Sequence, residues 1–251
     1  MAKTKKIQKF LDVQWDEMRN NLDDLCISWN GEKLHNLRLN AKKTKAVVSL
    51  LKNCSSKKKK FSIKKLKELF DHAGEIRTAQ LNVEALHENN IQNENLEKEQ
   101  NVIIERESHE LCNRKKAYSR NIKKLKKRNS LRSVKIKNKR ISTYYQKSLE
   151  QLKNNFLPPV KEDVWHESRK IIKRLLFAFT ALPKTLRQEI NFDKKYFDEL
   201  QDKIGKWHDT IIALNMLPTD HPGYNVLDIK KQMELEELVH LTSSFNEKVI
   251  S

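Results

Sequence analysis

The feature that most constrains the fold is a motif that occurs twice, 131 residues apart. Residues 34–45 read LHNLRLNAKKTK and residues 165–176 read WHESRKIIKRLL. At this offset the basic residues coincide in pairs: His35 with His166, Arg38 with Arg169, Lys42 with Lys173, and Lys43 with Arg174. LFDHAGEIRT at 69–78 and LQDKIGKWHD at 200–209 keep the same offset. Two motifs at one offset indicate a tandem duplication, and therefore a fold of two related halves.

Apolar residues at helical spacing, together with few turn-forming residues, predict an all-α fold. The chain has 4 glycines and 5 prolines in 251 residues, whereas a β-sandwich or barrel needs frequent Gly and Pro turns. One helical stripe comprises Leu34, Leu37, Ala41, Val48 and Leu51. We expect helices over residues 8–27, over 32–52 after Gly31, over 62–86, one or two within 102–155, one from an N-cap at Asp163 to a stop at Pro183, and two more near 194–217 and 228–248.

The boundary between the halves is predicted at Pro158-Pro159, because a Pro-Pro pair cannot continue a helix and makes a stiff connector. We expect a first helical bundle over residues 8–157 and a second over 160–248. The first half is longer because it carries a polar stretch and a basic segment that the second half lacks.

The charge balance predicts an anionic partner. The chain has 51 Lys and Arg against 33 Asp and Glu, a formal net charge of +18. Such a charge repels itself in a compact state, so nucleic acid, an anionic membrane or polyphosphate is expected as a partner. The alternative is a solvated surface that confers only solubility.

The cysteines and the apolar windows predict an intracellular protein. Cys26, Cys54 and Cys112 are odd in number, far apart and without a CxxC pair, so we expect neither a disulfide nor a zinc site, and hence a reducing compartment. The most hydrophobic window, 171–182, is interrupted by two basic residues and is too short to span a bilayer. The basic N-terminus lacks the apolar region of a signal peptide. The expected location is the cytoplasm.

The first repeated motif places a row of cations beside the apolar stripe of its helix. On a helical wheel, His35, Arg38, Lys42 and Lys45 lie within about 80° of one another. Because this row borders the buried edge, it is suited to a groove, where cations are less screened than on an open face. Arginine grips phosphate with paired hydrogen bonds, lysine adds compact charge, and histidine titrates near neutrality. A solvated basic face, or histidines with only structural roles, is the alternative.

Three further features carry candidate chemistry. Arg77 and His208 each follow a glycine by three residues, and a glycine permits close approach of either a helix or a ligand. His208-Asp209 is the pair used by some metal phosphohydrolases, although Arg77-Thr78 stands at the equivalent place. Residues 114–140 contain no acid and many Lys and Arg, with only Tyr118, Ile122 and Leu125 to pack a helix. Such a run is usually an exposed, solvated segment. The alternatives are that it extends the phosphate-binding surface or that it binds nucleic acid.

These motifs together resemble the CHAD family, the conserved histidine α-helical domain, over residues 8–248. The resemblance implies one domain spanning residues 1–251, two helical bundles related by pseudo-symmetry, and a basic groove between them that binds inorganic polyphosphate. The implied binding residues are His35, Arg38, Lys42, Lys43, Lys45, His166, Arg169, Lys173 and Arg174, with Arg77, His208, Arg120, Lys123 and Lys127 as secondary candidates. The sequence departs from the family pattern at two positions. Leu176 stands where the family usually has a basic residue, and Thr78 stands where it usually has an aspartate.

The leading hypothesis is therefore a non-enzymatic polyphosphate-binding protein, associated with polyphosphate granules and without a cofactor. P-loop, HExxH and GxSxG motifs are absent, so hydrolysis would require a separate triphosphatase or another polyphosphate-metabolising enzyme. The second hypothesis is nucleic-acid binding through residues 114–140. The third is a phosphohydrolase that uses His208 and Asp209.

Overall fold

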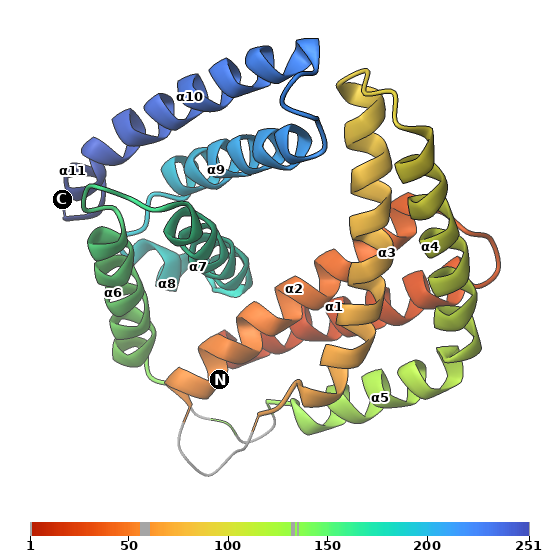
Figure 1. Cartoon of the computed structure of the whole chain (residues 1–251). Helices are drawn as coiled ribbons and strands as arrows, with labels where there is room; N and C mark the ends of the chain where they lie inside the picture. The colour runs from red at the N-terminus through yellow and green to blue at the C-terminus, as the bar shows by residue number, and fades with distance from the viewer. Residues whose placement is uncertain (1, 56–60, 132–133, 135, 251) are drawn as a thin grey trace. The chain divides into compact units, whose positions relative to one another are not determined.

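The structure, a computed structural model, describes residues 2–55, 61–131, 134 and 136–250 (Figure 1). These residues form helices joined by short turns, with no strand beyond an isolated bridge between Ser55 and Ile136. The helices are α1 (Ala2–Leu25), α2 (Gly31–Cys54), α3 (Lys64–Glu88), α4 (Glu94–Asn113), α5 (Lys115–Arg128), α6 (Asn138–Asn155), α7 (Glu162–Ala181), α8 (Lys184–Gln188), α9 (Lys194–Asn215), α10 (Pro222–Ser243) and α11 (Phe245–Ile250). The predicted all-α class is confirmed.

The chain divides into two compact units. Unit 1 comprises Met1–Glu84, Asn93–Ile141 and Phe177–Pro183, and unit 2 comprises Ala85–Gln92, Ser142–Leu176 and Lys184–Ser251. The predicted seam at Pro158-Pro159 lies within unit 2, between α6 and α7. Most of α6 therefore packs with helices of the second motif. The pseudo-symmetry of the halves stays a prediction.

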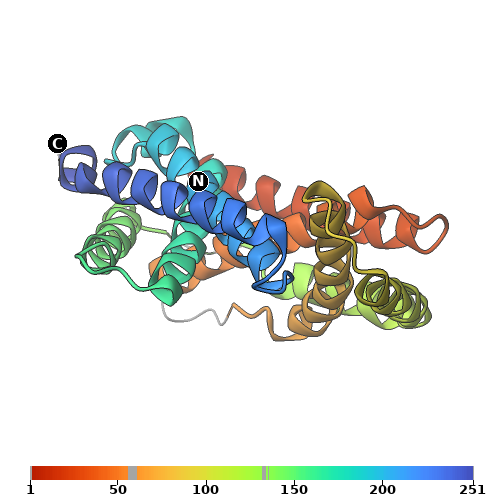
Figure 2. The ribbon, with the colours of Figure 1, turned by 45° about the horizontal axis from the view of Figure 1, so that its top comes forward.

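In unit 1, α1 and α2 lie side by side in both views (Figures 1 and 2). The apolar stripe of α1 is completely buried, with Leu11, Met18 and Leu22 all 0% exposed. Asn30 caps α2, because its side chain accepts hydrogen bonds from the backbone N–H groups of Glu32 (2.8 Å) and Lys33 (3.4 Å). Gly31, which we expected to precede the helix, is its first residue.

Three helices, not one or two, follow the α3–α4 turn. Helix α4 begins at Glu94, with Asn93 accepting a hydrogen bond from the Leu96 N–H at 3.1 Å. Arg114 alone separates α4 from α5, and its φ of −89° and ψ of 0° end the helical path. A single-residue break in a basic run carries no Gly or Pro signal, so the sequence did not reveal it. The three predicted packing residues of α5, Tyr118, Ile122 and Leu125, are buried as expected.

Unit 2 is built around aromatic side chains. Trp165 of α7 is 0% exposed and packs with Phe156 and Trp207, at ring-centroid distances of 5.3 and 6.4 Å. Helix α7 ends at Ala181, just before the predicted stop at Pro183. Asp163 is not its N-cap but its second residue, because the helix begins at Glu162.

The C-terminal helical segment is also longer and more divided than predicted. Instead of one helix over 228–248, α10 begins at Pro222 and α11 follows after Ser244. The side chain of His221 caps α10 by accepting a hydrogen bond from the Gly223 N–H at 3.0 Å. Proline at the first helical position is favoured because its missing N–H would have no partner there.

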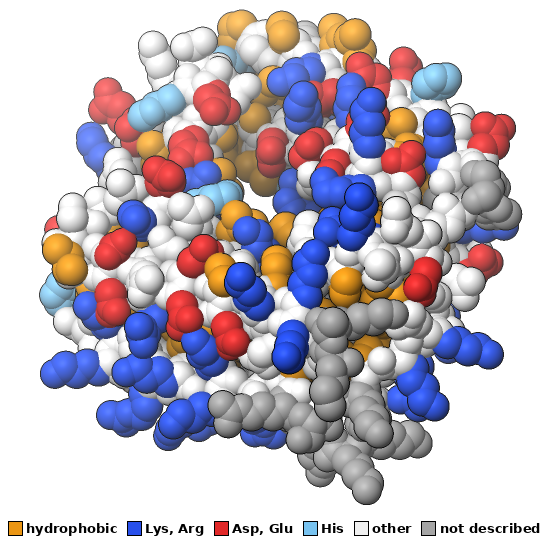
Figure 3. All heavy atoms as spheres, turned by 180° about the vertical axis from the view of Figure 1, so that it is seen from behind, with side chains coloured by type: hydrophobic (Ala, Val, Ile, Leu, Met, Phe, Trp, Pro, Cys, Tyr) orange, Lys and Arg blue, Asp and Glu red, His pale blue; other side chains and the backbone are white. Residues whose placement is uncertain are grey.

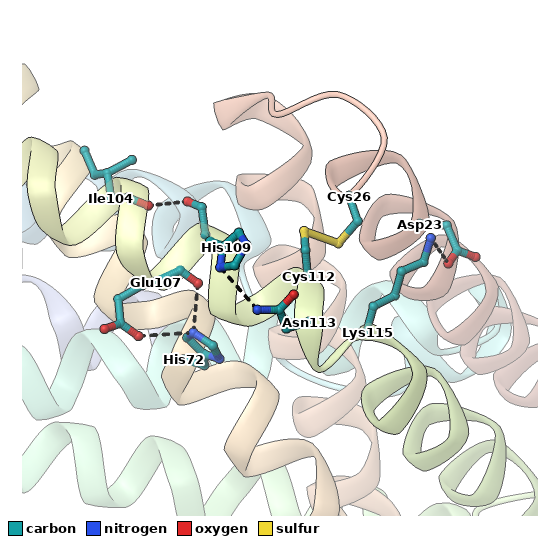
Figure 4. Close-up of a disulfide and its surroundings, with 10 residues drawn as sticks. Asp23, Cys26, His72, Ile104, Glu107, His109, Cys112, Asn113 and Lys115 are labelled. Atoms are coloured by element: carbon teal, nitrogen blue, oxygen red, sulfur yellow. Dashed lines mark hydrogen bonds and ion pairs between the residues drawn. A yellow bond between two sulfur atoms is a disulfide. The ribbon is translucent and has the colours of Figure 1, made fainter.

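The expectation that the cysteines form no disulfide is wrong. Cys26, directly after α1, forms a disulfide with Cys112 in the last turn of α4, with their Cα atoms 5.3 Å apart (Figure 4). The two cysteines are 86 residues apart in sequence, so only the packing of α4 against the end of α1 brings them together. Cys54 is buried with a free thiol. The cysteines therefore give no support for a reducing compartment.

Among the described residues, no helix is both long enough and apolar enough to cross a membrane.

Candidate polyanion-binding site

Within each unit, the arginine of the His/Arg/Lys motif lies against the glycine of the second motif. In unit 1, Arg38 of α2 donates a hydrogen bond from Nη1 to the carbonyl oxygen of Phe70 on α3, at 2.9 Å. A Cβ atom at Gly74 would lie only 2.7 Å from that Nη1 atom. The glycine therefore provides the space in which the guanidinium crosses α3.

Unit 2 repeats this contact at the predicted offset. Arg169 of α7 donates from Nε to the carbonyl oxygen of Gln201 on α9, at 3.0 Å. A Cβ atom at Gly205 would lie 2.5 Å from Arg169 Nη2. The sequence indicated that each glycine permits a close approach, and the structure identifies the approaching group as the arginine of the other motif. Each arginine thus ties its two helices together, and a guanidinium has further N–H donors beyond the one used here.

The cation faces of the two units differ at the positions of Lys45 and Phe70. In unit 1, Lys45 Nζ lies over the Phe70 ring, 3.9 Å from its centroid, and the Arg38 guanidinium lies 4.7 Å from it. In unit 2, Leu176 and Gln201 stand at the places of Lys45 and Phe70. Leu176 is 5% exposed. The departure at Leu176 therefore accompanies the loss of the aromatic ring that the lysine would face.

Burial and mutual repulsion weaken the protonated state of the cations in unit 1. The pKa of Arg38 is lowered by desolvation and by Arg77, while Asp71 opposes the shift. The pKa of Lys45 is also lowered, first by desolvation and then by Arg38 and Lys67, against the opposing effect of Asp71. Cations held in such surroundings favour an added anion, because its charge offsets both effects.

Unit 2 has a comparable cluster that includes two histidines. The rings of His166 and His208 have centroids 4.8 Å apart. Desolvation lowers the pKa of His166, and Lys170 and His208 lower it further. The pKa of Lys173 is lowered by desolvation and by Arg169, whereas Asp202 and Asp209 raise it. His166 Nδ1 is buried without a hydrogen-bond partner among the described residues.

The remaining predicted residues lie in several settings. His35 and Lys42 are exposed on α2, and Lys43 is half-buried. Arg174 is half-buried on α7. Arg77 forms an ion pair with Glu84, at 2.8 Å.

Arg120, Lys123 and Lys127 lie on α5, where all three are exposed. Arg38 lines a hollow of about 570 Å³ formed by residues of α2, α3 and α4, whereas Lys123 and Lys127 line a different groove beside α1. Lys123 and Lys127 therefore line a different hollow of unit 1 from Arg38.

Sequence comparison aligns Asp71 with Asp202 in the second motif but assigns these acids no role beside the cations. Asp71 acts on Arg38 and Lys45, and Asp202 acts on Lys173. The two acids are themselves 131 residues apart, at matching places in the second motif. This match was the sequence signal from which an acid beside each row of cations could have been predicted.

The described residues also bear on the metal-dependent alternative. No group of three or more His, Cys, Asp or Glu side chains in this part of the chain is placed to hold a metal ion. Desolvation raises the pKa of Asp209, against the opposing effect of Arg169 and His208. The carboxylate next to His208 thus faces cations of the same cluster.

The fold and these faces define an all-α protein with paired cationic motifs. The family model of the CHAD domain matches residues 9–218. The chain belongs to the CHAD family. It is similar in structure to the CHAD domain from the plant Ricinus communis, with a TM-score of 0.67 and 14% sequence identity over 99% of this chain and 91% of that one. No curated protein matches the sequence.

Proposed function

We propose that this protein binds inorganic polyphosphate through its two cationic faces and does not itself catalyse a reaction. The first face comprises His35, Arg38, Lys42, Lys43, Lys45 and Arg77, and the second comprises His166, Arg169, Lys173, Arg174 and His208. The observation that carries the proposal is the contact that recurs in both units, in which Arg38 and Arg169 each lie against a glycine and donate a hydrogen bond to a backbone carbonyl beside further lysines. Membership of the CHAD family supports it.

The chemistry of the faces suits a chain of phosphates. The arginines are oriented by their contacts with Phe70 and Gln201, so their side chains lose little further freedom when a ligand binds. Lys42 is exposed on the same helix as Arg38, and Lys173 lies one turn from Arg169. Polyphosphate carries charge along its whole length, and its oxyanions accept hydrogen bonds from both guanidinium and ammonium groups.

The proposal extends to the cellular setting. We place the protein in the cytoplasm at polyphosphate granules, where hydrolysis or synthesis of the polymer would belong to a separate enzyme such as a triphosphatase. A purified sample should then release no phosphate from polyphosphate, with or without added divalent metal. Metal-dependent release that disappears in His208→Ala would instead favour the phosphohydrolase hypothesis.

The decisive experiment removes charge without disturbing the arginine–glycine contacts. Labelled long-chain polyphosphate is titrated with wild-type protein and with Lys42→Gln/Lys173→Gln at several salt concentrations, because phosphate binding weakens with salt. We expect the double variant to bind more weakly at every salt concentration. The control is Lys98→Gln/Lys230→Gln, which removes the same charge from exposed lysines on α4 and α10. Equal losses in both variants would reduce the effect to net charge and refute the proposed site.

A further inference from the structure

Helix α5 has an outward cationic face that the proposed polyphosphate site does not use. The helix contains no acidic residue, and its apolar residues form one buried stripe. Opposite that stripe, within about 60° on a helical wheel, lie four exposed cations. They are Lys116, Arg120, Lys123 and Lys127. We call these four residues the α5 row.

Several cations beside the α5 row form ion pairs with acids of neighbouring helices. Lys126 forms an ion pair with Asp16 of α1 at 2.7 Å, and Lys115 forms one with Asp23 at 3.1 Å. Arg114, just before the helix, pairs with Glu68 of α3. In the part of the chain that the structure describes, no acidic side chain forms an ion pair with a member of the α5 row. These ion pairs fix α5 against α1 and α3. The cations of the α5 row remain available to an anionic ligand.

A groove of about 1750 Å³ runs between α1 and α5 beside this row. Lys123 and Lys127 line it from α5, and Lys5 and Lys9 line it from α1. Its lining also includes Val13, which is 41% exposed, and the carboxylates of Asp12 and Asp16, which accept hydrogen bonds from Gln8 and Lys126. The volume exceeds that of typical small-molecule pockets, which reach about 1,000 Å³. Figure 3 shows Lys and Arg side chains gathered along the lower left edge, where α5 lies in that view.

We propose that the α5 row and this groove bind the phosphate backbone of a nucleic-acid duplex, which is a function beyond the polyphosphate binding proposed above. From Lys116 to Lys127 the row covers 11 helical steps, or about 16 Å along the helix axis, and duplex phosphates recur every 3.4 Å per strand. A rigid helix therefore presents regularly spaced cations to a regularly spaced backbone. Sugar carbons beside the phosphates can contact the exposed side chain of Val13, which inorganic polyphosphate has no apolar groups to cover.

The same surface disfavours single-stranded ligands. Binding of single strands relies on exposed aromatic side chains on which bases stack. Trp15, which lines the groove, and Tyr118, the aromatic residue of α5, are each 1% exposed. Contacts from lysine and arginine to phosphate carry no sequence information, so the interaction should be independent of sequence.

The test measures binding of a fluorescein-labelled 20-base-pair DNA duplex to the full chain by anisotropy between 50 and 200 mM NaCl. Four phosphate contacts predict a slope of log K against log salt of about −4 for the α5 row alone. The variant that replaces all four residues of the row by Gln should lose about 4 units of that slope, roughly one for each contact. Its far-UV circular dichroism should match wild type, since all four side chains are exposed.

A variant with the same net charge provides the control. Lys147→Gln/Lys161→Gln/Lys195→Gln/Lys230→Gln removes four exposed lysines of unit 2 and should retain the wild-type slope. If both quadruple variants lose affinity equally, or if wild type fails to bind the duplex at 50 mM NaCl, the proposal is wrong. Displacement of the duplex by a poly-glutamate peptide at matched charge concentration would assign the surface to an acidic protein and also overturn it.

Two crossed measurements separate this proposal from the polyphosphate site. The α5 variant should bind polyphosphate as wild type does, and Lys42→Gln/Lys173→Gln should bind the duplex as wild type does. If the duplex is lost in Lys42→Gln/Lys173→Gln and kept in the α5 variant, the nucleic acid occupies the cationic faces and the α5 proposal fails. A failure of polyphosphate binding alone leaves the duplex result unaffected.

Discussion

The arginine–glycine contact can be tested by a double-mutant cycle in unit 2. Gly205→Ala places a methyl group 2.5 Å from Arg169 Nη2, so the guanidinium must move and lose its hydrogen bond to Gln201. A hydrogen bond from a charged group contributes about 1.5–3 kcal/mol. Alanine is favoured over glycine within a helix by about 1 kcal/mol. The balance predicts that Gly205→Ala lowers the free energy of unfolding by about 1 kcal/mol.

The same substitution should have the opposite sign without the arginine. Arg169→Met removes the guanidinium that a methyl group at residue 205 would contact. In this background Gly205→Ala should therefore raise the free energy of unfolding by about 0.5–1 kcal/mol. The coupling energy of the cycle is then about 1.5–2 kcal/mol, within the range for residues in contact. Urea denaturation followed by circular dichroism at 222 nm measures all four proteins. Equal stabilisation in both backgrounds would show that the guanidinium does not lie against Gly205.

Three further predictions concern the cysteines and the histidine pair. Replacing Cys26 and Cys112 by Ser should lower the free energy of unfolding by about 2–4 kcal/mol, because the disulfide closes a long loop; an unchanged urea midpoint would contradict this. Burial raises the pKa of the Cys54 thiol to about 12, so the native oxidised protein should not react with Ellman's reagent at pH 8, and prompt colour would refute that burial. The pKa of His166 is lowered in the free protein, and bound polyphosphate should favour its protonated form. Affinity for polyphosphate should therefore rise as the pH falls between the pKa values of the bound and free states. The rise should be at most about tenfold per pH unit. Affinity that is flat across this interval, or a pH response that survives in His166→Gln, would exclude it.

The sequence was sufficient where the relevant pattern is local. The apolar stripe of α2 is buried as predicted, and so are the three packing residues of α5. The 131-residue offset correctly paired Arg38 with Arg169 and Gly74 with Gly205, because both members of each contact are retained. Repetition thus carried information about contacts between helices that periodicity alone does not contain.

The sequence was insufficient where chemistry depends on helices distant in the chain. The Cys26–Cys112 disulfide needs the end of α4 to pack beside the end of α1, and no spacing rule reports that. His72 is another example, since its ring hydrogen-bonds the Tyr118 hydroxyl and the Glu107 carbonyl oxygen, each at 3.0 Å. Its place in the second motif gave no hint of this buried link among α3, α4 and α5. Asp71 and Asp202 match at the same offset, but their proximity to the lysines and arginines depends on how two helices pack, which the sequence does not report.

The two faces have diverged in a way that bears on how each holds an anion. Where unit 1 has Arg77, unit 2 has His208, whose ring centroid lies 4.8 Å from that of His166. In unit 1 Lys45 lies over the Phe70 ring, whereas unit 2 has Leu176 and Gln201 at these two places. Unit 1 therefore has the larger share of fixed charge, whereas part of the charge of unit 2 depends on proton uptake. Acidification should accordingly strengthen the contribution of unit 2 to polyanion binding more than that of unit 1.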